Sequence, residues 1–311
     1  MAAALPFANL DLPQVWLAHT LFAFAFGACI GSFLNVCIYR IPLDQSVVRP
    51  GSHCMSCGHA IPWWQNIPIL SYFLLRGRCH YCKATFSCRY ALVELLTAGL
   101  FVLPFLAFPP DLIVSPADAL ELPHAVPGTP VLGIVRLATP AMIPVLWVFL
   151  SGLVIATFVD FDHFIIPDSV SLGGIVAGLA LSAAVPEMQG QATWLRGLAF
   201  SGIGALAGSG VLLAVAWLGR KAFRKEAMGM GDVKFLGAIG AFFGWQAVFF
   251  TLVVGAFLGS FVGILLIVLG KGRLGSRIPF GPYLALGAFV WAFWGPAIVE
   301  AYLAMLAPPV P

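Results

Sequence analysis

Long apolar runs alternate with short polar segments along the whole chain, and this alternation predicts helices that cross a membrane. One crossing needs about 20 apolar residues. The runs that meet or approach this length lie at about 15–37, 90–108, 140–160, 169–186, 196–218, 233–245, 247–270 and 281–305. We therefore expect an all-α polytopic membrane protein with about eight transmembrane helices.

The sixth of these runs is short for a membrane crossing. Only Gly244-Trp245-Gln246 separates it from the seventh run. The two runs are therefore expected to form either a tight hairpin or one broken helix.

The first apolar run lacks the two features that flank the apolar part of a signal peptide. No basic segment precedes it, and Asn35, Tyr39 and Arg40 follow where a small-residue cleavage site would lie. We expect a retained transmembrane helix at this position.

Composition and charge placement agree with a membrane location and give the helices a direction. Hydrophobic residues make up 60% of the chain and charged residues only 9%, whereas soluble domains carry roughly 25% charged residues. Of the 16 basic residues, 14 lie in or beside three loops, at 38–89, 220–234 and 271–279. Basic loops remain in the cytoplasm. We therefore expect the three basic loops in the cytoplasm and both termini on the outer side of the membrane. The bilayer is the expected surrounding of the helices, and no nucleic-acid partner is expected.

The loop 38–89 contains two C-x2-C pairs with 21 residues between them, at Cys54, Cys57, Cys79 and Cys82. Four thiolates at this spacing predict a closed, tetrahedral structural zinc site. The alternative is a pair of disulfides, which a reducing cytoplasm disfavours. Three histidines are alternative ligands: His53, His59 and His80.

An aromatic segment lies between the two cysteine pairs. Residues 61–72 include Trp63, Trp64 and Tyr72. Such side chains favour the headgroup layer of a bilayer. We expect the cysteine-containing lobe to lie against the membrane.

Acidic residues end the third apolar run, where a carboxylate is costly and marks a candidate functional site. Asp160 lies deepest in the run and is expected to face the bundle interior, whereas Asp162 would point roughly 200° away on a helix. Asp168 follows a proline and begins the next run, so we interpret it as a helix N-cap.

Asp232 follows Gly229 and Gly231 in the sequence MGMGDVK, which ends with Lys234. Alternation of the helices brings Asp232 back to the same membrane boundary as Asp160. Two carboxylates held close share a proton and can act as acid and base on a peptide bond, as in aspartic proteases. The glycines would allow an extended substrate to lie close. Alternatively, both acids are helix-boundary residues, or they belong to a transporter.

Several motifs together resemble those of the bifunctional prepilin leader peptidases, which are GxGD intramembrane aspartic proteases. They are GSFLNVCIYRIP, the two C-x2-C pairs, WxxNIPxxSY, RYxLVELLTA, the D-x6-P-D run from Asp160 to Asp168, MGMGDVKFLG and PFGPYLALG. The resemblance implies that Asp160 and Asp232 are catalytic.

The same resemblance implies a substrate, a location and a second reaction. The family cleaves the basic leader of type IV prepilins and type II secretion pseudopilins at the cytoplasmic face of the bacterial inner membrane. It then methylates the new N-terminal residue, usually phenylalanine, with S-adenosylmethionine. The cysteine lobe matches the bifunctional form of the family.

The methyltransferase residues are less evident in the sequence. No glycine-rich loop follows a strand, so a Rossmann-type cofactor site is not expected. Glu94, Asn35 and Arg40 face the lobe and are candidates for holding the cofactor or the amine. The alternative for Glu94 is an interfacial ion pair with Arg89 or another arginine of the loop.

These expectations divide the chain into four parts. They are a first transmembrane helix (1–37), a methyltransferase-associated zinc lobe (38–89), a second helix with an outward Pro/Ala loop (90–130) and an aspartic peptidase membrane domain (131–311). The alternatives are a peptidase without methylation, or a transporter with a zinc-stabilised lobe. A zinc-dependent enzyme is opposed by the filled four-cysteine shell.

Overall fold

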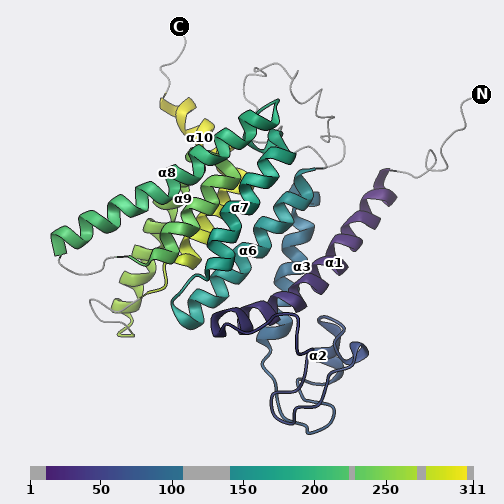
Figure 1. Cartoon of the computed structure of the whole chain (residues 1–311). Helices are drawn as coiled ribbons and strands as arrows, with labels where there is room; N and C mark the ends of the chain where they lie inside the picture. Colours follow the sequence, from purple (N-terminus) through teal and green to yellow (C-terminus); the bar gives the residue numbers. More distant parts are fainter. Residues whose placement is uncertain (1–11, 108–140, 224–227, 272–277, 307–311) are drawn as a thin grey trace, which may run out of the picture. The chain divides into compact units, whose positions relative to one another are not determined.

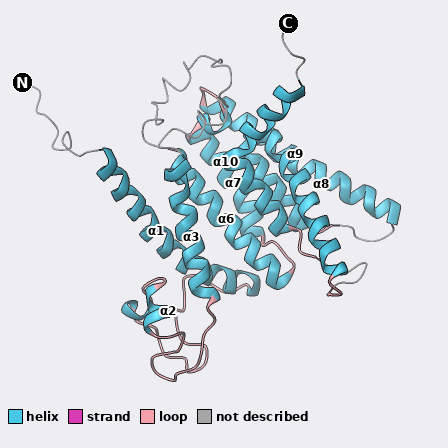
Figure 2. Cartoon of the chain, turned by 180° about the vertical axis from the view of Figure 1, so that it is seen from behind, coloured by secondary structure: helices cyan, strands magenta, loops and turns pink. Residues whose placement is uncertain are grey.

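The computed structural model describes residues 12–107, 141–223, 228–271 and 278–306, and helices dominate these residues (Figures 1 and 2). No strand occurs in these ranges; the only β pairing within them consists of two isolated bridges, His53–Ala60 and Arg78–Thr85. The expected all-α class is confirmed. The predicted outward loop, about 109–139, lies outside the described residues.

Two compact units make up the chain. The first comprises Met1–Arg40 and Asp44–Ile113, and the second comprises Ile41–Leu43 and Val114–Pro311. The first unit therefore contains the cysteine lobe, and the second contains both Asp160 and Asp232.

In the first unit, α1 (Leu12–Arg40) packs against α3 (Arg89–Ala107), and the short helix α2 (Leu70–Leu74) lies in the lobe between them in sequence. The two helices approach closely because α1 has glycines at the contact. A Cβ at Gly27 would lie 2.7 Å from Phe101 Cβ, and one at Gly31 would lie 2.7 Å from Glu94 Cα. These small residues, four apart on α1, let the two helices approach closely.

The second unit is a bundle of helices around α9. Its helices are α6 (Met142–His163), α7 (Asp168–Ala184), α8 (Trp194–Phe223), α9 (Met230–Val268) and α10 (Gly281–Leu306). Helix α9 packs against α7, α8 and α10. Residues 235–244 are all buried, so the first part of α9 forms the core of the bundle.

Helix α9 folds back sharply at Gly244. This residue has φ 81° and ψ −178°, which is not helical. A Cβ at Gly240 would lie 2.9 Å from the side chain of Val248, although eight residues of straight helix would separate them by about 12 Å. The expected alternatives were a hairpin or a broken helix, and the chain adopts the tight turn.

Six of the described helices are long and apolar enough to cross a membrane, and α7 is a shorter apolar helix. The two arms of α9 raise the number of apolar segments from six to seven, and α7 is the eighth in the described part of the chain. This agrees with the eight apolar runs in the sequence.

The turn in α9 leaves backbone carbonyls that a continuous helix would have satisfied, and buried polar side chains replace the missing donors. Gln189, in the 3-10 turn Pro186–Gln189, donates to the carbonyls of Ala241 and Phe242 at 2.9 and 3.0 Å. Ser201 of α8 also donates to Ala241, at 2.7 Å. Unpaired backbone groups are costly away from water, so Gln189 stabilises the turn.

Glycine pairs allow α8 to pack directly on the first arm of α9. A Cβ at Gly204 would collide with the carbonyl oxygen of Gly240, and a Cβ at Gly240 would collide with that of Gly204. Gly202 differs, because nothing lies within 4 Å of its Cβ position.

We predict that Gly204→Ala lowers the unfolding free energy by about 1–3 kcal/mol, because the added methyl group forces two helix backbones apart. Gly202→Ala is the matched control and should change stability by no more than about 0.5 kcal/mol. Thermal unfolding in detergent measures both variants. Equal stability of the two would show that the glycine contact does not restrict packing.

Candidate functional site

Asp160 lies near the end of α6 and is buried, with 4% of its surface exposed. Its Oδ2 atom accepts a hydrogen bond of 2.9 Å from the backbone N–H of Gly281. Gly281 is the first residue of α10, where backbone N–H groups lack intrahelical partners. The start of α10 therefore fixes the orientation of the Asp160 carboxylate.

Asp232 lies in the first turn of α9, and Gly229 is the residue that precedes this helix as its N-cap. The carboxylates of Asp232 and Asp160 are close enough to interact electrostatically. Two acids 72 residues apart in sequence thus meet at one end of the bundle, and the predicted approach of their helix ends is observed. Asp162 is exposed, whereas Asp160 is buried, as the helical geometry predicted.

Two glycines bring three backbone segments together beside the acids. A Cβ at Gly231 would lie 3.2 Å from the backbone N and O atoms of Ile166, in the segment that joins α6 to α7. A Cβ at Gly281 would lie 2.7 Å from Asp160 Oδ2 and 3.0 Å from Ile166 Cδ1. The lack of a side chain at both positions lets this chain pack on itself around the acids.

The remaining glycine of the motif faces the second acid. A Cβ at Gly229 would lie 3.3 Å from Asp232 Oδ2. The surface of Gly229 is exposed. A role of Gly229, Gly231 and Lys234 in substrate access stays a prediction.

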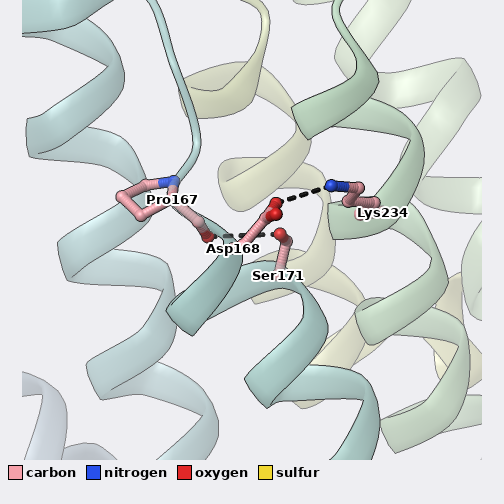
Figure 3. Close-up of polar contacts among 4 residues, drawn as sticks. All are labelled: Pro167, Asp168, Ser171 and Lys234. Carbon is pink, nitrogen blue, oxygen red and sulfur yellow. Dashed lines mark hydrogen bonds and ion pairs between the residues drawn. The ribbon is translucent and has the colours of Figure 1, made fainter. Parts of the chain in front are cut away.

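Asp168 pairs with Lys234, and the N-cap interpretation of Asp168 is wrong (Figure 3). The N-cap residue of α7 is Pro167, and Asp168 makes no side-chain capping bond. Instead, Lys234 Nζ lies 2.7 Å from Asp168 Oδ1, while Ser171 Oγ donates to the Pro167 carbonyl at 3.1 Å. The ion pair joins the first turn of α7 to the first turn of α9, two residues beyond Asp232.

A separate cavity of about 1010 Å³ lies within the first unit. Its walls include all three residues that the sequence suggested for methyl transfer, Asn35, Arg40 and Glu94. Glu94 Oε2 accepts a 2.6 Å hydrogen bond from the backbone N–H of Ile69. Asn35 Nδ2 donates to the Tyr90 carbonyl at 3.0 Å.

Arg40 organises one wall of this cavity. Its buried guanidinium donates to the backbone carbonyls of Ser46, Pro50 and Gly51, at 3.0, 2.7 and 3.4 Å. These bonds hold the loop that leads from α1 to the first cysteine pair. Arg40 therefore has a structural role in shaping the cavity.

The four cysteines of the lobe converge. The Sγ atoms of Cys54, Cys57, Cys79 and Cys82 all lie within 4.8 Å of one another, and none of these cysteines forms a disulfide. The Cys54–Cys82 Sγ separation is 3.8 Å, which matches the edge of about 3.8 Å of a tetrahedron with Zn–S bonds of about 2.3 Å. The donor set therefore fits zinc.

The three histidines of the lobe are not part of this cluster of four sulfur atoms. His59 contacts the ring of Tyr81 with centroids 3.7 Å apart, and His53 Nδ1 lies 2.9 Å from the Gly51 carbonyl oxygen. These contacts leave the four thiols as the metal-binding candidates in the described residues of the lobe.

Both cysteine pairs lie on similar tight turns. Gly58 N donates to the Cys54 carbonyl at 2.8 Å, and Lys83 N donates to the Cys79 carbonyl at 3.1 Å. Gly58 and Lys83 both have positive φ, 70° and 58°. The two turns thus present their sulfur atoms in equivalent ways.

The turn backbone also acts on the thiols electrostatically. The N–H groups of Cys57 and Ser56 lower the pKa of Cys54 to about 6, and the thiolate is the form that binds metal. The Ala84 N–H lowers the pKa of Cys82, but desolvation and the neighbouring sulfur atoms outweigh it and raise this pKa to about 11. Four thiolates at these separations repel one another, so all four are deprotonated together only when a cation lies between them.

Sequence reasoning missed two features of these sites. The sequence assigned no role to Gly281, although its motif, PFGPYLALG, was among those that carried the resemblance. Gln189 lies in a short polar segment between apolar runs, and no local pattern indicates that it would fold inward.

Comparison with known proteins gives matches in both halves of the chain. Residues 25–108 match the model of the bacterial peptidase A24 N-terminal domain, and residues 147–264 match that of the type IV leader peptidase family. No solved structure matches the chain.

Curated relatives cover nearly the whole chain. A prepilin leader peptidase/N-methyltransferase of Aeromonas hydrophila is 36% identical and covers 93% of this chain and 94% of its own. Proteins with the same name from Pseudomonas putida and Pseudomonas aeruginosa are 32% and 31% identical and cover 90% and 92% of this chain; the matches span 92% and 94% of those proteins. On these matches, the chain belongs to the type IV leader peptidase family.

Proposed function

We propose that this protein removes the basic leader peptide of type IV prepilins and type II secretion pseudopilins and then methylates the new N-terminal amine. The observation that carries the peptidase half is the meeting of Asp160 and Asp232 at one end of the bundle. The relatives, which are named for both activities, support the pair of reactions.

The two carboxylates supply the acid and the base for hydrolysis. Like charges held close disfavour double ionisation, so the pair carries one shared proton. The ionised carboxylate takes a proton from a water molecule as that water attacks the scissile carbonyl. The protonated carboxylate then donates its proton to the leaving nitrogen. The Gly281 N–H keeps Asp160 oriented during these transfers.

The membrane location explains how the substrate reaches the acids. The apolar helices make this a multi-pass membrane protein. In the bacterial inner membrane, its basic loops favour a cytoplasmic location for the helix ends that carry Asp160 and Asp232. A basic leader stays in the cytoplasm by the same rule, while the hydrophobic helix of a prepilin lies in the bilayer. The bond between them then lies at the level of the two acids.

Within this arrangement, Lys234 is a positioning residue. Its ion pair with Asp168 holds the first turns of α7 and α9 together. The Ile166 backbone, which contacts Gly231, lies just before Asp168. This contact and the ion pair keep Asp232 close to Asp160.

The cavity of the first unit fits S-adenosylmethionine as methyl donor. Its volume of about 1010 Å³ is sufficient for a ligand of this size. Ser71 Oγ, on the cavity wall, is a buried polar atom without a hydrogen-bond partner in the described residues. Glu94 would hold the cationic or hydroxyl groups of the cofactor, and Asn35 would help to hold the acceptor amine. The bound cofactor supplies an electrophilic methyl group.

Zinc would serve this cavity as a structural ion. Cys54 and Cys79 line the cavity as well as belonging to the four-sulfur cluster. A closed shell of four thiolates leaves zinc no position for substrate. The ion therefore supports the walls of the methyl-transfer site rather than the chemistry.

A transporter is disfavoured by the placement of the acids. Asp160 and Asp232 lie together at one end of the bundle rather than along a path through it. A peptidase without methylation remains the alternative, and the following predictions distinguish it from the bifunctional enzyme.

Asp160→Asn and Asp232→Asn should each lower prepilin cleavage by at least about a thousandfold, because a proton-sharing pair fails when either member is neutralised. Asp162→Asn is the control, since Asp162 is exposed two residues from Asp160. Purified protein and a reconstituted prepilin give the cleavage rates. Near-normal cleavage by either of the first two variants would overturn the assignment of the pair.

Glu94→Gln should abolish methylation and leave cleavage unchanged. The amide keeps the shape of the side chain and an oxygen that can accept from Ile69 N, but it removes the charge. Mass spectrometry of the cleaved pilin reports both reactions in one sample. Unchanged methylation would contradict the proposed role of Glu94.

Cys79→Ser should remove bound zinc and methylation together while cleavage persists, because the cluster supports the walls of the cavity and the two acids lie in the second unit. Cys88→Ser is the control, since exposed Cys88 is outside the cluster. Metal analysis of the purified wild type should find about one zinc ion per chain, as a closed four-cysteine site requires. Wild-type protein free of zinc yet active in methylation would exclude the proposal.

A further inference from the structure

Helix α2 presents its apolar face outward. Leu70, Phe73 and Leu74 share one face of the helix, and Phe73 and Leu74 are 67% and 68% exposed. The opposite face is turned to the protein: Ser71 is buried, and the ring of Tyr72 packs on Phe86 with centroids 5.6 Å apart. In a water-soluble lobe the apolar stripe of a helix faces the core. In α2 the apolar face points away from the protein instead.

One hydrogen bond fixes the level of α2 relative to a membrane helix. The N–H of Ile69, directly before α2, donates to Glu94 Oε2 at 2.6 Å. Glu94 lies five residues into α3, about 7.5 Å along its axis. Helix α3 is one of the candidate membrane spans, and its Leu92 and Leu95 are exposed. The start of α2 is therefore held at the depth at which α3 already faces lipid.

The residues around α2 suit the boundary between water and lipid. Trp63 and Trp64 are both exposed on one side of it in sequence, and Arg76 and Arg78 are exposed on the other. Tryptophan favours the headgroup region, and arginine is attracted to anionic lipids. Together with the outward face of α2, these residues form a surface that we call the wedge, residues 63–78.

We propose that the wedge is seated in the headgroup layer of the bilayer, with Leu70, Phe73 and Leu74 inserted among the lipids. The occupant of this apolar face is lipid because the Glu94–Ile69 bond ties it to a membrane-spanning helix at that depth. The amphipathic helices that lie in such interfaces bury one apolar face by about 5–10 Å.

The wedge also forms a wall of the methyl-transfer cavity. Gln65, Ser71 and Tyr72 line the cavity from the side opposite to the exposed apolar face. On the proposed function, the acceptor amine belongs to a pilin whose helix remains in the bilayer. Seating of the wedge places the cavity at the level where this amine emerges, so methylation depends on membrane contact by α2, whereas cleavage by the second unit does not.

Photocrosslinking tests the seating without reference to activity. A p-benzoylphenylalanine residue replaces Phe73 in the full chain, reconstituted into vesicles of phosphatidylethanolamine and phosphatidylglycerol. Met55 is the matched control site, because it is 65% exposed but lies in the first cysteine turn. Illumination should give lipid adducts at position 73 and few at position 55. Equal lipid labelling of both sites, or crosslinks from position 73 to a second copy of the chain, would overturn the proposal.

A second measurement tests the consequence for methylation. Phe73→Glu should lower methylation of a reconstituted pilin about tenfold, the factor that corresponds to losing burial of one aromatic side chain, with cleavage and bound zinc unchanged. Phe73→Leu, which keeps an apolar side chain on the same exposed face of α2, should leave both reactions close to their wild-type rates. Normal methylation in Phe73→Glu would refute the dependence on seating. A wild type that cleaves but never methylates would refute the proposed methyltransferase, while the lipid adducts would still decide whether the wedge is seated.

Discussion

The close approach of three backbone segments is the constraint on which the arrangement of Asp160 and Asp232 depends. The segment around Ile166 and the starts of α9 and α10 meet where Gly231 and Gly281 have no side chains. A Cβ at Gly231 would press on the Ile166 backbone, and a Cβ at Gly281 would press on the Asp160 carboxylate. The hydrogen bond from Gly281 to Asp160 and the Lys234–Asp168 ion pair join the same segments.

In the first unit, side-chain hydrogen bonds to the backbone determine the shape of the cysteine lobe. Its lobe has little apolar interior, and backbone hydrogen bonds from buried or charged side chains give it shape. Arg40 holds one loop through three carbonyls, and Glu94 holds the start of α2. A metal ion held by the four cysteines would cross-link two turns that are 21 residues apart. Small lobes commonly need such a metal or disulfide to fold.

Much of this organisation could be predicted from the sequence because its signals are local or topological. Apolar runs predicted the helices, the cysteine spacing predicted the four-sulfur cluster, and helix alternation predicted that the ends carrying Asp160 and Asp232 would meet. The partners of these groups were not predictable in the same way. The Gly281 N–H, the side chain of Gln189 and the pairing of Asp168 with Lys234 each depend on contacts between distant segments. A preference for capping suggested one role for Asp168, and a lysine 66 residues away determined another.

The contact between Gly204 and Gly240 restricts how this sequence can change. Each residue lies against the carbonyl oxygen of the other, so enlarging either one is blocked by backbone, which no compensating change of a side chain can move. A second substitution at the partner glycine would add a second clash instead of relieving the first. Both single and paired replacement are therefore disfavoured at these positions, although Gly204 lies on α8 and Gly240 lies eight residues beyond Asp232 on α9. The distance between the axes of α8 and α9 thus limits variation at two positions that do not contact the acids.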